Sequence, residues 1–129
     1  MINSIYNRIS TRTFKNEILS KDEIKEIMSI INSMQSIKGP FGNDFDFTFS
    51  LNDDKSDQGQ KIGTYGLIKN VPAFIGGVSK NTIESIIDFG FVFEHLLLLL
   101  TNKGFETCWL GGTFKRKEYR EQLHDNEII

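Results

Sequence analysis

Apolar residues recur every three or four positions early in the chain, which is the spacing of one face of a helix. The members of this face are Ile24, Ile27, Met28, Ile31 and Met34. Ser20 and Glu23 stand before it at the spacing of a capping box, in which each side chain binds a free backbone N–H at the helix start. The pattern predicts a helix over Lys21–Gln35, ended by the sequence GPFGN.

Alternating and continuous apolar runs predict strands elsewhere in the chain. FDFTFSL (45–51) alternates large apolar and polar residues, AFIGGVS (73–79) reads as a buried strand, and FETCWL (105–110) predicts another. EII at 127–129 resembles the start of a strand. Between these runs, NDDKSDQGQK (52–61) predicts a loop and KRKEYREQL (115–123) a short amphipathic helix. This order of elements predicts a mixed sheet with helices packed on it.

The segment from about Asn81 to Lys103 predicts a long helix, which Gly104 ends. The run HLLLLL and the apolar residues before it surround this helix on every side. A helix that is apolar all round must be buried all round, and one sheet of a small domain does not cover every face. We therefore expect the helix to pack against a partner chain. The alternative is a central helix wrapped entirely by its own domain.

Composition limits the class of protein. A chain of 129 residues with 39% hydrophobic and 25% charged residues is typical of a single globular domain, here residues 1–129. Its net charge of −2 gives no general attraction for nucleic acid or anionic lipid. Cys108 is the single cysteine, no signal peptide is visible, and the leucine run is too short to span a bilayer. These features predict a cytoplasmic protein without nucleic-acid or membrane partners.

The side chains that most often carry chemistry are poorly placed for it. His95 and His124 have no further ligand at metal-site spacing, so no metal is expected. Cys108 lies inside an apparent strand, where a buried inert thiol is the expectation. No nucleophile elbow, Walker loop or dinucleotide fingerprint is present. Three features remain: RISTR at 8–12, GTYG at 63–66 and CWLGGTF at 108–114.

These features carry a family resemblance. RISTRTF, GTYGLIKNVPAFI and GFVFEHLLLLLTNKGFETCWLGGTF resemble the FMN-dependent nitroreductase-like flavoproteins, in particular the branch with the CWLGG signature. The resemblance runs from about Ile5 to Phe114. It implies an α+β fold, a three-layer α/β/α sandwich with a mixed, mainly antiparallel sheet, dimeric through the long apolar helix. Family members normally continue past the EII strand, so the resemblance implies that the C-terminal part of the usual fold is missing here.

The resemblance also implies which residues bind the cofactor: Arg8, Ser10, Arg12, Thr64, Tyr65, Leu110, Gly111 and Gly112. Arg8 and Ser10 would contact the ribityl-phosphate of FMN, and Arg12 would approach the pyrimidine end of its ring. A positive charge there stabilises the anion of the reduced flavin. The mid-chain pair at 64–65 would lie beside the ring. The N–H of Gly111 would face flavin N5, with its two neighbours lining the ring.

The implied activity is hydride transfer from NADH or NADPH, through flavin N5, to a small electrophilic acceptor such as a nitroaromatic or a quinone. No side chain is assigned a catalytic role, and the family is a homodimer with FMN at the interface. The alternative is a truncated or degenerate dimer that binds flavin or another small molecule without turnover. Two local alternatives also stay open. Lys115 and Arg116 either help to hold the phosphate or begin a solvated helix, and Gly42 and Asn43 either reach a flavin across the interface or form a turn.

Overall fold

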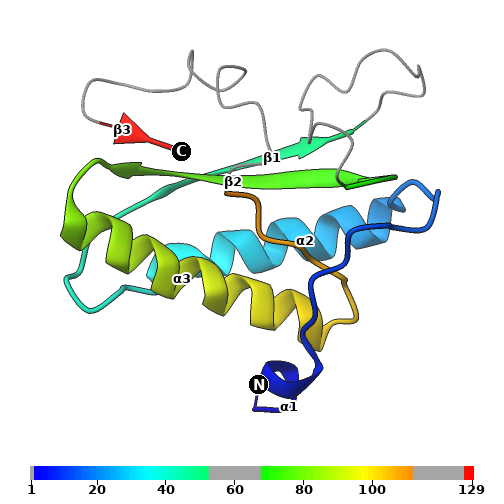
Figure 1. The fold of residues 1–129 in the computed structure, drawn as a ribbon, viewed down its shortest axis with the longest axis horizontal. Coiled ribbons are helices and arrows are strands. Elements are labelled where there is room, and N and C mark those ends of the chain that lie inside the picture. The colour runs from blue at the N-terminus through cyan, green and yellow to red at the C-terminus, as the bar shows by residue number, and fades with distance from the viewer. Residues whose placement is uncertain (1, 53–67, 112–126) are drawn as a thin grey trace.

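The computed structural model describes residues 2–52, 68–111 and 127–129. Along the described residues the elements are α1 (Ile2–Asn7), α2 (Lys21–Ser33), the 3₁₀ turn η1 (Met34–Ser36), β1 (Asp46–Leu51), β2 (Ala73–Lys80), α3 (Ile83–Asn102) and β3 (Glu127–Ile128). The strands form one sheet in the order β1-β2-β3, with antiparallel pairing throughout. All three helices lie on the same side of the sheet: α2 and α3 run beneath it, and α1 lies beyond α3 (Figure 1).

The predicted capping box forms at the start of α2. The Ser20 hydroxyl oxygen accepts from the Glu23 N–H at 3.1 Å, and the Glu23 carboxylate accepts from the Ser20 N–H at 2.7 Å. The helix ends at Ser33, two residues before the predicted end, because the last turn tightens into η1 and buries Met34. Sequence therefore placed this helix correctly and missed only the change of pitch at its end.

Three of the predicted strands are confirmed. β1 pairs with β2 from Asp46 opposite Val78 to Leu51 opposite Ala73. The short β3 pairs with the end of β2, as the EII pattern predicted. β1 presents alternating Phe side chains, of which Phe47 and Phe49 pack against the helices. The sheet thus covers the apolar faces of α2 and α3.

The predicted strand at 105–110 is wrong. This segment makes one isolated bridge, between Thr107 and Ser10, and joins no named strand. It leaves the end of α3 and runs between the helices and β2 (Figure 1). An alternating pattern specifies an extended backbone with one apolar face, but a strand also needs a neighbour along its length to complete the ladder. Here the partner is available at one residue only.

The long helix is confirmed, with bounds Ile83–Asn102, and Gly104 follows it at a φ of +90°. Val92, Leu96 and Leu100 are at most 3% exposed and form the centre of the core with α2. Burial all round is not observed, however. Four apolar residues in the first half of α3 are between 44% and 74% exposed, namely Ile83, Ile86, Ile87 and Phe91. The described residues therefore do not wrap the whole helix.

The described residues make a helical layer and a sheet, which supports the α+β class. The second helical layer of the predicted sandwich is not formed by these residues. The loop after Asn52 and the amphipathic segment 115–123, including Lys115 and Arg116, lie outside the described residues. In the described part of the chain, no helix has both the length and the apolar character that crossing a bilayer requires.

Candidate functional site

Two segments that are distant in sequence lie side by side next to α3. The residues after α1 run parallel to the segment that leaves α3, with Ser10 bridged to Thr107. The backbone N–H of Thr11 donates to the Thr107 carbonyl at 2.9 Å. The RISTR segment therefore adjoins the residues that lead into CWLGG.

Arg8 and Trp109 meet at one carboxylate of α3. Arg8 Nε lies 3.3 Å from Glu94 Oε1. The indole N–H of Trp109 donates to Glu94 Oε2 at 2.7 Å. The Arg8 side chain is only 20% exposed, and that of Glu94 is 40% exposed. One anionic group thus holds the two segments from the helix side.

Unpaired polar atoms gather at the same place. Among the described residues, four buried side-chain polar atoms lack a hydrogen-bond partner: Arg8 Nη1, Thr11 Oγ1, Thr107 Oγ1 and Thr48 Oγ1. The first three belong to the two adjoining segments. A buried donor or acceptor without a partner costs about 1–3 kcal/mol, and folded proteins keep few of them. Their concentration at one junction marks it as a place where a polar ligand group can bind.

The other predicted site residues have different surroundings. Arg12 is exposed, and its carbonyl accepts from the Lys69 N–H at 2.9 Å. Leu110 packs on a small apolar cluster formed by Ile68, Val71 and Phe74. Gly111 is exposed, and a Cβ added there would meet no described atom within 4 Å. The remaining three predicted residues, Thr64, Tyr65 and Gly112, lie outside the described residues.

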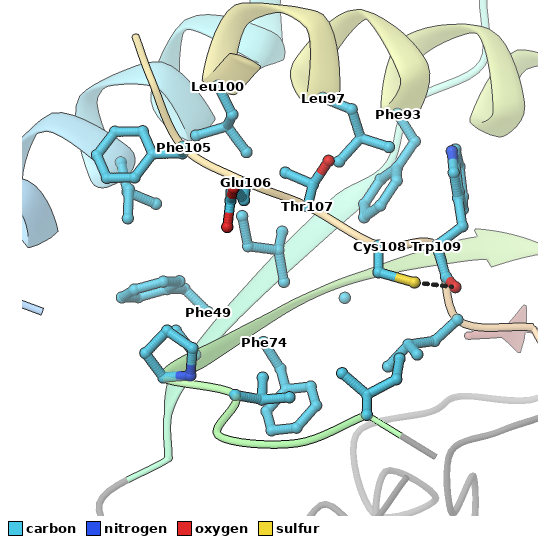
Figure 2. Close-up of a pocket in the computed structure, with 18 of the residues that line it drawn as sticks. Phe49, Phe74, Phe93, Leu97, Leu100, Phe105, Glu106, Thr107, Cys108 and Trp109 are labelled. Carbon is cyan, nitrogen blue, oxygen red and sulfur yellow. Dashed lines mark hydrogen bonds between the residues drawn. The ribbon is translucent and has the colours of Figure 1, made fainter. Parts of the chain in front are cut away.

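An apolar cavity of about 320 Å³ lies beside this junction, between β2, the second half of α3 and the 105–110 segment. Figure 2 shows its wall of aromatic and aliphatic side chains, among them Phe74, Phe93 and Leu97. Of the eight predicted site residues, Leu110 alone lines it in the described part of the chain. Arg8, Ser10 and Arg12 do not line it, but Thr107 and Trp109 belong both to the junction and to the cavity wall, so the two features adjoin through these residues.

Sequence reasoning missed the carboxylate of Asp88, which is fully buried in α3. It accepts hydrogen bonds from the N–H of Phe41 and of Asn43 and from the Asn43 side chain, each at 2.7–2.8 Å. Burial by itself raises the pKa of Asp88, but these three hydrogen bonds outweigh it and hold the pKa below its ordinary value. A lone aspartate in an apolar helix was the available signal.

Residues 42–43 form a turn, and whether they also approach a flavin across an interface stays a prediction. The Gly42 N–H donates to the Gly39 carbonyl at 3.1 Å, and Gly42 has a φ of +75°. The Asn43 side chain is engaged with Asp88. The turn is therefore built around the buried carboxylate.

The side chains discounted from sequence have ordinary surroundings. Cys108 is partly buried against the Ile68 cluster, and its thiol contacts the Trp109 carbonyl at 3.5 Å. His95 is partly buried in the middle of α3. Among the residues that the structure describes, no group of three or more His, Cys, Asp or Glu side chains is arranged to hold a metal ion.

The fold is similar to that of solved nitroreductase-like proteins. Solved structures with this fold include a nitroreductase family protein from Clostridium difficile 630, with a TM-score of 0.70 and 15% identity over 99% of this chain and 78% of that one. A nitroreductase family protein from Clostridium novyi NT has a TM-score of 0.68 and 19% identity over 99% of this chain and 80% of that one. A protein described as an oxidoreductase containing FMN has a TM-score of 0.72 and 14% identity over 97% of this chain and 70% of that one.

The family itself is shown by sequence. The family model described as "Putative TM nitroreductase" matches residues 1–129, so the chain belongs to this nitroreductase family. No curated protein matches the chain. The family membership confirms the resemblance to nitroreductases that the motifs carried.

Proposed function

We propose that the protein is an FMN-dependent oxidoreductase that passes hydride from NADH or NADPH to a small electrophilic acceptor such as a nitroaromatic or a quinone. The observation that carries the proposal is the buried, unpaired Nη1 of Arg8 beside the segment that leads to Gly111. Family membership and the similarity of the fold to an oxidoreductase containing FMN support it.

The residues at the junction fit FMN. The cofactor has an anionic phosphate, and a guanidinium N–H that lacks a partner is a strong donor to such a group. It also has a flat ring, and at the exposed Gly111 an added Cβ would meet no described atom within 4 Å, which leaves space beside the main chain. We assign Arg8 and Ser10 to the phosphate and the Gly111 N–H to flavin N5.

The remaining assignments follow the family resemblance. Arg12 would supply positive charge near the pyrimidine end of the ring, Leu110 and Gly112 would line the ring, and Thr64 and Tyr65 would lie beside it. When bound, FMN supplies the hydride chemistry. The chain's own residues bind the phosphate, orient the ring and keep water from it.

We further propose that the protein acts as a homodimer. α1 packs against α3, and its Ile2, Ile5 and Tyr6 are between 59% and 82% exposed. An apolar surface of this extent is typical of an interface, and a second copy carries the same surface. Ile87→Lys should give a monomer by light scattering, and Ile18→Lys, at a more exposed apolar position on neither helix, should not. A wild-type monomer at micromolar concentration would contradict the proposal.

The visible spectrum of the purified protein tests the activity directly. Flavin absorption near ~450 nm that bleaches on addition of NADH or NADPH supports the oxidoreductase. Flavin absorption that neither nicotinamide bleaches supports a binding module without turnover. A colourless protein that ignores added FMN would overturn the proposed cofactor.

The single cysteine agrees with a reducing compartment, and we propose the cytoplasm, which cell fractionation tests.

A further inference from the structure

Glu94 joins the two halves of the proposed flavin site through separate oxygens. Oε1 faces Arg8 Nε at 3.3 Å, and Oε2 accepts from Trp109 Nε1 at 2.7 Å. The Trp109 ring points toward α3 (Figure 2). Arg8 belongs to the segment proposed to hold the phosphate, and Trp109 precedes Leu110 and Gly111 by one and two residues. The carboxylate therefore contacts both sides of the site at once.

The contact fixes the direction of the whole guanidinium. This group is planar and rigid, so a partner at Nε also sets where Nη1 points. In the structure Nη1 is covered from solvent and has no hydrogen-bond partner among the described residues. Glu94 thus forms an ion pair with Nε and leaves Nη1 without a partner among the described residues.

An ordinary surface ion pair would look different. Exposed pairs contribute about 0–1 kcal/mol, and an arginine that only neutralises a carboxylate favours a two-pronged contact with both oxygens. Here the two oxygens serve two different residues, and the Arg8 side chain is 20% exposed. Trp109 is further packed against Phe93, with ring centroids 5.0 Å apart. The arrangement fixes three side chains together.

We infer that Glu94 is a positioning residue of the flavin site, which aims Arg8 at the phosphate and holds Trp109, and with it the main chain that follows, in register with Arg8. This inference rests on the proposed function. Positioning of Arg8 by Glu94 favours phosphate binding, but the negative charge of Glu94 also repels the phosphate. The sign of the effect of a substitution at Glu94 therefore separates positioning from simple repulsion.

Two substitutions at Glu94 test the inference. Glu94→Gln has one carbonyl oxygen, which cannot accept from both Arg8 and Trp109 in the present arrangement. Glu94→Asp keeps the charge but is one methylene too short to reach both. We expect each variant to bind FMN about tenfold more weakly than wild type, as for the loss of one charge-assisted contact. Riboflavin lacks the phosphate, so its affinity should fall clearly less than that of FMN, and the loss that remains reports the part of the effect that acts through Trp109 and the main chain after it. Glu84→Gln, a change of the same charge on the exposed start of α3, is the matched control and should leave both affinities unchanged.

Trp109 provides a readout that needs no flavin, because it is the single tryptophan of the chain. Its emission should shift in flavin-free Glu94→Gln and Glu94→Asp and stay at the wild-type position in Glu84→Gln. Thermal unfolding establishes that each variant is folded, and if Glu94→Gln is not, Glu94→Asp carries the test.

The outcomes separate this inference from the proposed function. Wild-type protein that binds neither flavin overturns both. Wild-type protein that binds FMN while both Glu94 variants bind it equally well or more tightly overturns the positioning role alone. An equal loss of FMN and riboflavin affinity would mean that Glu94 only supports the fold, and would also overturn it.

Discussion

Two carboxylates on the same helix, Asp88 and Glu94, are used in opposite ways. Asp88 is fully buried, and three donors from the 41–43 turn occupy its two oxygens. Glu94 is 40% exposed, and it binds an arginine that still has an unpaired, buried nitrogen. The first network is closed, because every polar group facing Asp88 has its partner. The second network is open, because Arg8 Nη1 has no hydrogen-bond partner among the described residues and could donate to a ligand.

The difference separates structural from functional polar groups without reference to any motif. A buried charge is tolerated when its hydrogen bonds are complete, and removing one side of such a network leaves donors stranded. An incomplete network costs free energy in the folded chain, and a ligand that completes it recovers that cost on binding. Changes at Asp88 should therefore act on stability, and changes around Glu94 should act on ligand affinity.

The largest effect is expected for Asp88→Asn. The substitution keeps the volume but turns an acceptor into a donor that faces the N–H groups of Phe41 and Asn43. We expect the largest fall in melting temperature of all the variants discussed, measured by circular dichroism. Glu84→Gln, on the exposed start of the same helix, should leave the melting temperature within error. A variant as stable as wild type would mean that the turn does not depend on the carboxylate.

The difference in stability between wild type and Asp88→Asn should depend on pH. In the folded protein the pKa of Asp88 lies below its ordinary value of 3.8. A lowered pKa stabilises the fold above the unfolded value, and this contribution is lost as pH falls through the folded value. The difference in free energy of unfolding between wild type and Asp88→Asn should thus be constant above about pH 5 and shrink below pH 3.8. Urea titrations across this range measure it. A difference that grows toward low pH would contradict the assignment.

Arg8→Ala removes the side chain that is proposed to bind the FMN phosphate. Loss of a charge-assisted contact should weaken FMN binding by about 1.5–3 kcal/mol, roughly 10- to 150-fold. Riboflavin binding should change much less, since it lacks the phosphate. Flavin fluorescence quenching measures both affinities, and Lys15→Ala, an exposed cation further along the same segment, is the control. If FMN affinity is unchanged in Arg8→Ala, the phosphate assignment is wrong.

Sequence alone specified the local parts of this fold well. The helix over 21–35 came from a capping box and one apolar stripe, both of which depend only on neighbouring residues, and the structure contains it. The segment 105–110 shows the limit. Its sequence FETCWL predicted a strand, but the segment makes one isolated bridge and joins no strand, because the partner of an extended segment is set by tertiary packing.

The site was predicted from family resemblance more than from residue chemistry. Neighbouring positions of Ser10 and Thr107 agree with the expected approach of RISTR to CWLGG, but the assignments of individual residues stay predictions. Glu94 was not found because a glutamate in a helix has no distinguishing pattern. Its role depends on two partners from opposite ends of the chain, Arg8 and Trp109, which only the folded structure brings together.

Gly39, which lies against Asp88, and Gly111, in the proposed flavin site, allow the same comparison to be made at the backbone. A Cβ at Gly39 would lie 2.6 Å from the Asp88 Cα, so Gly39→Ala must displace the helix or the turn. We expect a loss of about 1–3 kcal/mol of stability by urea unfolding. Gly111→Ala meets no described atom within 4 Å and should change stability by less than about 0.5 kcal/mol. Reduced FMN affinity in Gly111→Ala at unchanged stability would support a ligand on this backbone, and equal stability losses would contradict the contrast.

The smallest effect on binding is expected for Arg12→Ala. Arg12 is exposed, and its backbone carbonyl accepts from the Lys69 N–H. If its charge lies near the pyrimidine end of the ring, its removal destabilises the reduced, anionic flavin more than the neutral oxidised one. The reduction potential of the bound flavin should then fall, while the affinity for oxidised FMN changes less than in Arg8→Ala. Dye equilibration against a reference couple measures the potential. Lys69→Ala controls for the loss of a neighbouring exposed cation. An unchanged potential with a large loss of affinity would show that Arg12 acts like Arg8, and the two arginines would then share the phosphate.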